Sequence, residues 1–213
     1  MKIRNPSLGL LLGLGALLLS YPFVEQNANG RTVVNVLGIV VILLATRMIS
    51  HTRADNRLAW FLAALPIGAQ LWFAVYHDAW VGAWVAAMQA LFYGYVAWSY
   101  VSYMRRDDVA TLDEIFAAAA TFIVLALFFA CLFWLLDFVS PGSFVSSYAV
   151  RESGALTWYE FVYLSFTTLS TTGFGDTAPV TSFARALVMA EQFVGVMYVA
   201  LVIAMLTAAT RKP

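Results

Sequence analysis

Charged residues are scarce in this chain of 213 residues, because only 11% are Asp, Glu, Lys or Arg, whereas 62% are hydrophobic. A soluble core of this length cannot hide so much apolar surface, and the mean hydropathy of +0.80 indicates an integral membrane protein. The formal net charge is zero, so nothing in the charge balance favours nucleic acid as a partner. The single cysteine, Cys131, lies in an apolar run and cannot form an intrachain disulfide.

Enzyme motifs are also missing from the sequence. It contains no His-Glu-x-x-His motif, no Gly-x-Ser-x-Gly motif and no phosphate-binding loop. We therefore expect neither catalysis nor an organic cofactor, and no small-molecule substrate is indicated. A membrane enzyme or receptor remains an alternative, which the discovery of a bound cofactor would support.

Long apolar segments dominate what is present. Six of them can cross about 30 Å of hydrocarbon as helices, which takes about 20 residues each. They lie near residues 7–24, 33–50, 58–76, 79–103, 115–138 and 182–209. Their apolar runs are continuous and do not alternate, which favours helices over the strands of a barrel. The first segment resembles a signal peptide, but no small-residue cleavage pattern follows it, so we interpret it as a transmembrane helix.

The distribution of basic residues predicts the orientation. If both termini are cytoplasmic, that side holds Lys2, Arg4, Arg47, Arg53, Arg57, Arg105, Arg106, Arg211 and Lys212. The other side holds only Arg31, Arg151 and Arg185. This asymmetry follows the positive-inside rule and places residues 139–182 on the outer side of a cell membrane.

A glycine motif between the last two segments is the most informative feature. Residues 171–176 read Thr-Thr-Gly-Phe-Gly-Asp. Successive carbonyls point to one side when alternate residues adopt left-handed or otherwise unusual backbone angles, which glycine tolerates. The motif therefore predicts a narrow column of carbonyl groups, which is an ion-selectivity filter.

The segment before this motif, residues 157–169, is too short to span a membrane. Thr157 and Glu160 have the spacing of a capping box, which predicts a helix beginning there. We expect a re-entrant pore helix whose carboxyl end, partly negative, favours a cation at the centre of four copies.

The motif resembles the filter of potassium channels, which runs Thr-Val-Gly-Tyr-Gly, with Thr here for Val and Phe for Tyr. The resemblance extends over residues 112–210 and is to the two-helix pore module of bacterial ion channels. Further matching positions are Pro179-Val180-Thr181, Arg185-Ala186-Leu187, Glu191-Gln192-Phe193-Val194-Gly195 and Tyr198-Val199-Ala200.

The resemblance implies a role for each residue of the motif. Potassium ions bind the carbonyls of Thr171, Thr172, Gly173 and Phe174, and Gly175 makes the outer turn. Asp176 then lies just outside, where its carboxylate concentrates cations or anchors the filter to the pore helix. Tyr163 either donates a hydrogen bond to Asp176 or packs as an ordinary aromatic residue.

Two residues of the last segment are candidates for gating or packing. Gly195 lies where the family has a hinge glycine, and close helix packing is the alternative. A glycine inside a helix costs about 1 kcal/mol relative to alanine, so its presence requires a reason. Glu191 is an ionisable residue within a span. We interpret it as a protonated or hydrogen-bonded residue with a structural role, and a gating role is the alternative.

The first four segments lack the pattern of a voltage sensor. Residues 79–103 contain no arginine or lysine, so we expect weak or no voltage dependence. We divide the chain into a four-helix transmembrane domain, 1–110, and a pore domain, 111–213. A scaffold, a lipid or small-molecule sensor and an assembly domain all remain open for residues 1–110.

The sequence thus predicts an all-α membrane protein with six transmembrane helices, and with the pore helix and filter between the fifth and sixth. One filter segment cannot enclose an ion, so we expect a homotetramer in lipid that conducts K⁺ passively. We expect no cytosolic sensing domain after Pro213. The alternatives are a cation channel that also passes sodium, because Thr172 and Phe174 loosen the filter, and a potassium transporter subunit, although those carry four pore loops in one chain.

Overall fold

The computed structural model describes residues 6–20, 30–49, 54–76, 79–104, 111–147 and 156–210. These residues form seven helices and two short strands. In chain order they are α1 (Pro6–Leu19), α3 (Gly30–Ile49), α4 (Asn56–Tyr76), α5 (Ala79–Met104), α6 (Leu112–Val139), β1 (Phe144–Ser146), α7 (Trp158–Leu169), β2 (Thr177–Pro179) and α8 (Ser182–Thr210). A helix therefore lies in each of the six apolar segments, although α1 ends at Leu19 and residues 21–24 of the first segment lie outside the described residues. The helix α7 covers the segment in which a pore helix was expected.

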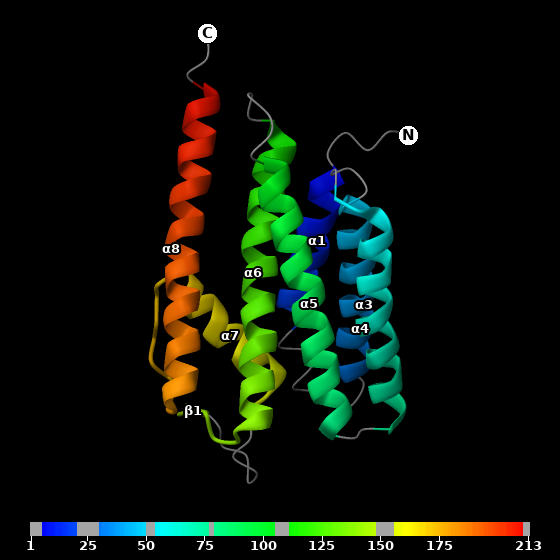
Figure 1. Ribbon diagram of the computed structural model, residues 1–213, viewed down its shortest axis with the longest axis vertical. Helices are drawn as coiled ribbons and strands as arrows, with labels where there is room; N and C mark the ends of the chain where they lie inside the picture. The colour runs from blue at the N-terminus through cyan, green and yellow to red at the C-terminus, as the bar shows by residue number, and fades with distance from the viewer. Residues whose placement is uncertain are drawn as a thin grey trace.

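Successive long helices run in alternate directions along the bundle (Figure 1). Because the described part of the bundle contains six such helices, α1 begins and α8 ends at the same end of the molecule. The short helix α7 extends only part of the way along α6 and α8, and the chain then returns to the end at which α7 began (Figure 1). This path is that of a re-entrant segment.

Among the described helices, α6 and α8 are long and apolar enough to cross a membrane by length and composition, and the apolar parts of α1 and α3 are shorter. At 1.5 Å per residue, the 21 residues of α4 extend about 31 Å and the 26 residues of α5 about 39 Å. Their length suffices for spanning, whereas their tryptophan, tyrosine and glutamine side chains lower their hydropathy. The count of six spans stays a prediction.

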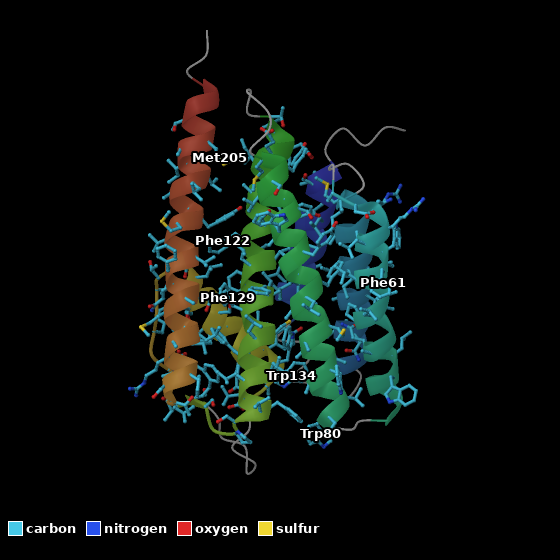
Figure 2. All side chains as sticks on the ribbon, in the orientation of Figure 1. Phe61, Trp80, Phe122, Phe129, Trp134 and Met205 are labelled. Carbon is cyan, nitrogen blue, oxygen red and sulfur yellow. The ribbon has the colours of Figure 1, made fainter. Side chains whose placement is uncertain are left out.

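The central helix is α6, which packs against α1, α5, α7 and α8. It begins with a capping box in which the Thr111 hydroxyl accepts from the Glu114 N–H at 3.3 Å and the Glu114 carboxylate accepts from the Thr111 N–H at 3.0 Å. Small buried side chains let the neighbouring helices approach it closely, namely Ala117, Ala120, Ala126 and Ala130. The aromatic residues Phe122 and Phe129 of α6 lie between α6 and α8 (Figure 2).

The last helix, α8, is buried along one narrow stripe. Buried and half-buried residues recur at alternating intervals of four and three residues, at Ala184, Val188, Glu191, Gly195, Tyr198, Val202 and Met205, flanked by Leu187 and Val194. This spacing is that of a helix packed along one seam. The rest of α8 is exposed and largely apolar, with Phe183 and Phe193 exposed to 79% and 68%.

The strands β1 and β2 form an antiparallel pair with Phe144 opposite Pro179. Two further backbone bonds extend it, from the Ser147 N–H to the Asp176 carbonyl at 2.7 Å and from the Val180 N–H to the Ser143 carbonyl at 2.8 Å. The described residues are mostly helical, in agreement with the sequence prediction, and this two-stranded sheet is an element that the sequence did not predict. It ties the connection after α6 to the segment that follows the glycine motif.

Candidate functional site

The helix α7 begins as the spacing of Thr157 and Glu160 predicts. The Thr157 hydroxyl accepts from the Glu160 N–H at 3.3 Å, and the Glu160 carboxylate accepts from the Thr157 N–H. Two N–H groups of the first turn are thereby satisfied, which a helix end buried in apolar surroundings requires. The capping box therefore sets the start of α7 at Trp158.

Aromatic pairs hold α7 against α6 at both ends. Near its start, the rings of Trp158 and Trp134 lie 5.4 Å apart between centroids. Near its end, the rings of Phe166 and Phe122 lie 6.3 Å apart in an edge-on arrangement. Such pairs add about 0.5–1.5 kcal/mol each beyond their buried area, so α7 is fixed against α6 near both of its ends.

The loop after α7 has left-handed backbone at alternate residues. The φ angles are 59° at Thr171, 53° at Gly173 and 79° at Gly175. Glycine adopts such angles freely, whereas a β-branched residue such as Thr171 is strained there. The alternation is the one that brings successive carbonyls to one side of the chain.

The N–H groups of this loop bond back to the end of α7. Thr171 donates to the Thr168 carbonyl at 2.9 Å, and Thr172 and Gly173 both donate to the Thr167 carbonyl, at 2.8 and 3.0 Å. Within the described parts of the chain, no backbone N–H donates to the carbonyls of residues 171–175. All five residues are exposed in the single chain, so their carbonyl oxygens are available as ligands.

Side chains beside the loop make local contacts. The rings of Phe174 and Tyr163 stack, with centroids 6.4 Å apart and planes 7° apart, so the ring of Tyr163 packs on the loop itself. The Asp176 carboxylate accepts from the Thr177 N–H at 2.9 Å. The hydroxyls of Thr172 and Ser170 are 2.9 Å apart.

Gly195 lies directly against the carboxyl end of α7. A Cβ atom at this position would overlap the carbonyl oxygen of Leu169 and lie 3.1 Å from its carbonyl carbon and Cα. Backbone atoms cannot move aside as the end of a flexible side chain can. The absence of a side chain at Gly195 is therefore what lets α8 approach α7 next to the loop.

Glu191 lies one turn before Gly195 on the same stripe and is fully buried. Its Oε1 atom is hydrogen-bonded to the Ser165 hydroxyl of α7. Further along α8, the Tyr198 hydroxyl donates to the Ala118 carbonyl of α6 at 2.7 Å. The sequence marked Glu191, but it gave no signal for Ser165, which is one of several hydroxyl residues in α7.

The helix α1 is hydrogen-bonded to α6 at its start and to α7 at its end. At its start, the N–H and hydroxyl of Ser7 each donate to a carboxylate oxygen of Asp113 in α6, both at 2.9 Å. At its end, the hydroxyls of Ser20 and Tyr159 of α7 are 2.9 Å apart. Since the Ser20 hydroxyl donates to the Leu17 carbonyl at 2.6 Å, Tyr159 is the donor in that contact. The sequence contained no local signal for these contacts.

Acidic ligands for a cation are not grouped in the described residues, because no cluster of three or more His, Cys, Asp or Glu occurs among them. The oxygen atoms gathered at residues 171–175 are backbone carbonyls. Such neutral oxygen ligands suit monovalent cations that exchange part of their hydration shell.

One family model matches the part of the chain that contains this loop. A family model described as "Ion channel" matches residues 120–212, a range that includes most of α6, all of α7, the loop and α8. Residues 120–212 are therefore similar to an ion channel domain, and the two helices that are long and apolar enough to cross a membrane agree with this similarity. Comparisons with curated proteins and with solved structures found no match.

Proposed function

We propose that the chain forms a potassium-selective channel that conducts K⁺ passively. The observation that carries the proposal is the loop 171–175, with left-handed backbone at alternate residues and with carbonyls that no backbone N–H of the described residues occupies. In this proposal the carbonyls of Thr171, Thr172, Gly173 and Phe174 replace the hydration shell of the ion. Gly175 makes the turn that ends the column.

Four copies of the chain are part of the proposal. One loop supplies only one side of an ion site, and Phe174 is 71% exposed in the single chain. The broad apolar face of α8 is exposed next to it. Closed rotational symmetry is the rule for homo-oligomers, and a four-fold axis surrounds an ion with four equivalent carbonyls at each level.

The channel is voltage-insensitive in this proposal, because α5, the helix in fourth place, contains no arginine or lysine. A single charge crossing the field would change the ratio of open to closed channels about 50-fold per 100 mV. We further propose that the channel lies in the cell membrane with both termini cytoplasmic, in agreement with the positive-inside rule.

The test is the reversal potential of the purified protein in a planar bilayer under a potassium/sodium gradient. We expect reversal near the potassium equilibrium potential, and loss of that selectivity in Gly173→Ala. The matched control is Gly142→Ala, because Gly142 also has a left-handed φ, 80°, but lies in the turn after α6, outside the loop.

A reversal potential near zero with intact current would contradict potassium selectivity. It would favour the alternative of a cation channel that also passes sodium, in which Thr172 and Phe174 loosen the loop. Equal loss of selectivity in Gly142→Ala and Gly173→Ala would show that backbone strain outside residues 171–175 also changes the current. This result would contradict the assignment of these residues as the selectivity filter.

A further inference from the structure

The hydroxyl of Ser165 touches two oxygen atoms from two different helices. Its Oγ atom lies 2.7 Å from the Ala126 carbonyl of α6 and is hydrogen-bonded to Oε1 of Glu191 in α8. Ser165 and Glu191 both have no exposed surface. Three helices therefore meet at one buried polar group, one turn before the end of the pore helix.

The hydroxyl of Ser165 has too few protons to donate to both of these oxygen atoms. A serine hydroxyl has one proton to donate and two lone pairs that accept. The Ala126 carbonyl can only accept, so the hydrogen bond at this 2.7 Å contact uses the single proton of Ser165. The contact between Ser165 and Glu191 is then a hydrogen bond only if its proton comes from Glu191.

The surroundings of the second carboxyl oxygen also indicate that Glu191 carries a proton. Oε2 of Glu191 is buried and has no hydrogen-bond partner among the described residues. An ionised carboxylate spreads its charge over both oxygens, and burying that charge without a partner is so unfavourable that such groups become neutral instead. A neutral carboxyl leaves only a carbonyl-type oxygen unpaired, which is much less unfavourable.

We infer that Glu191 carries a proton and donates it to Ser165, so that a chain of two hydrogen bonds runs from α8 through α7 to α6. Glu191 is thus a positioning residue for the pore helix. It fixes the middle of α7 against α8, while Gly195, one turn further along α8, fixes the carboxyl end of α7 at Leu169. Only the consequence for ion selectivity rests on the proposed function, because the proton and the bridge are properties of the fold.

Infrared spectroscopy of the full chain in lipid tests the proton directly, without any ion current. At neutral pH, the difference spectrum between the natural protein and Glu191→Gln should contain the C=O stretch of a protonated carboxyl group. A difference spectrum with carboxylate bands alone would overturn the inference.

Thermal unfolding of the same two proteins gives a second readout. Glutamine has the shape of the protonated acid and donates to Ser165 through its amide, so the unfolding midpoint of Glu191→Gln should stay within about 2 °C of the natural protein. A clear rise of the midpoint would overturn the inference, because glutamine would then have removed a buried charge.

The bridge itself is tested at Ser165. Ser165→Ala leaves the proton of Glu191 without an acceptor and should lower the midpoint by about 5 °C. The matched control is Ser99→Ala, since Ser99 is also a buried helical serine but its hydroxyl donates within its own helix, to the Tyr95 carbonyl at 2.7 Å. Combining Ser165→Ala with Glu191→Leu should recover part of the loss, because both partners of the bond are then apolar.

Equal effects of Ser165→Ala and Ser99→Ala, or no recovery in the double variant, would overturn the bridge. The reversal potential separates this result from a failure of the proposed function. If the channel is potassium-selective, Ser165→Ala should lose selectivity and Glu191→Gln should keep it. If no variant is potassium-selective, the infrared and unfolding results still decide the inference.

Discussion

Thr171 has a strained backbone conformation within the loop. Its φ of 59° lies in the left-handed region, where glycine occurs at the other two positions of the alternation. We predict that Thr171→Gly raises the free energy of unfolding by about 1 kcal/mol, because relief of backbone strain exceeds the entropy that glycine adds to the unfolded chain. The same change should lower the K⁺/Na⁺ permeability ratio, because Thr171 supplies one of the proposed ion-binding carbonyls and glycine lets its backbone move.

The matched control for this prediction is Thr172→Gly, at the neighbouring residue, whose φ is not positive. It should lower the stability measured by denaturant unfolding, since no strain is relieved. A loss of stability in Thr171→Gly comparable to that in Thr172→Gly would contradict strain at Thr171 as the reason for the gain.

Gly195 allows a sharp test between packing and hinge motion. Alanine at this position would overlap the Leu169 backbone, so we predict that Gly195→Ala lowers the free energy of unfolding by about 1–3 kcal/mol. The control is Gly15→Ala in α1, where a Cβ atom meets nothing within 4 Å. There, alanine should stabilise the helix by about 0.5–1 kcal/mol. If Gly195→Ala also stabilises the protein while slowing channel opening, Gly195 acts as a hinge and not as a contact.

The sequence identified Gly195 and Glu191 as residues that require a reason, but it could not identify their partners. Each partner lies 26 residues earlier, Leu169 for Gly195 and Ser165 for Glu191. The constant offset means that α7 and α8 run side by side in the same direction. No local pattern links residues so far apart, since the offset depends on the length and path of the loop between the two helices.

At the scale of elements, hydropathy and capping predicted the helices well because both are local properties. The six apolar segments and the start of α7 at the Thr157 capping box follow from residues within one or two turns. The pairing of β1 with β2 was missed because Phe144–Ser146 and Thr177–Pro179 are too short to show an alternation and are far apart in sequence. The attachment of α1 to α6 and α7 was missed for the same reason.

The attachment of α1 at its carboxyl end leads to a prediction about coupling between elements. The Tyr159 hydroxyl of α7 donates to Ser20 after α1. In a double-mutant cycle, Ser20→Ala and Tyr159→Phe should show a coupling free energy of about 0.5–1.5 kcal/mol in unfolding experiments. The control cycle pairs Ser20→Ala with Tyr95→Phe, because the Tyr95 hydroxyl donates to the Asp55 carbonyl in another part of the bundle. Coupling of equal size in both cycles would show that the Ser20–Tyr159 bond has no specific role.

These contacts give the described helices α1 and α5 a structural role that the sequence left open. The described helix α1 lies against α6 and reaches the start of the pore helix, and α5 packs along α6. A displacement of α1 would therefore change the contact between Ser20 and Tyr159 of α7. The division of the chain at residue 110 stays a prediction, whereas the contacts of α1 with α6 and α7 are a property of the fold.

At the scale of the whole molecule, the loop and one face of α8 are exposed in the single chain, and mixing experiments test the proposed tetramer by counting the chains in each channel. When equal amounts of the natural chain and Gly173→Ala assemble at random, and one altered loop abolishes selectivity, about one sixteenth of four-fold assemblies keep only natural loops. We therefore predict that selective K⁺ current falls to about this fraction, because each ion site needs four intact loops. Mixing with Gly15→Ala, whose added Cβ meets nothing within 4 Å, should leave the current unchanged. A remaining current of about one quarter would indicate a dimer with two loops per pore, and would contradict the tetramer.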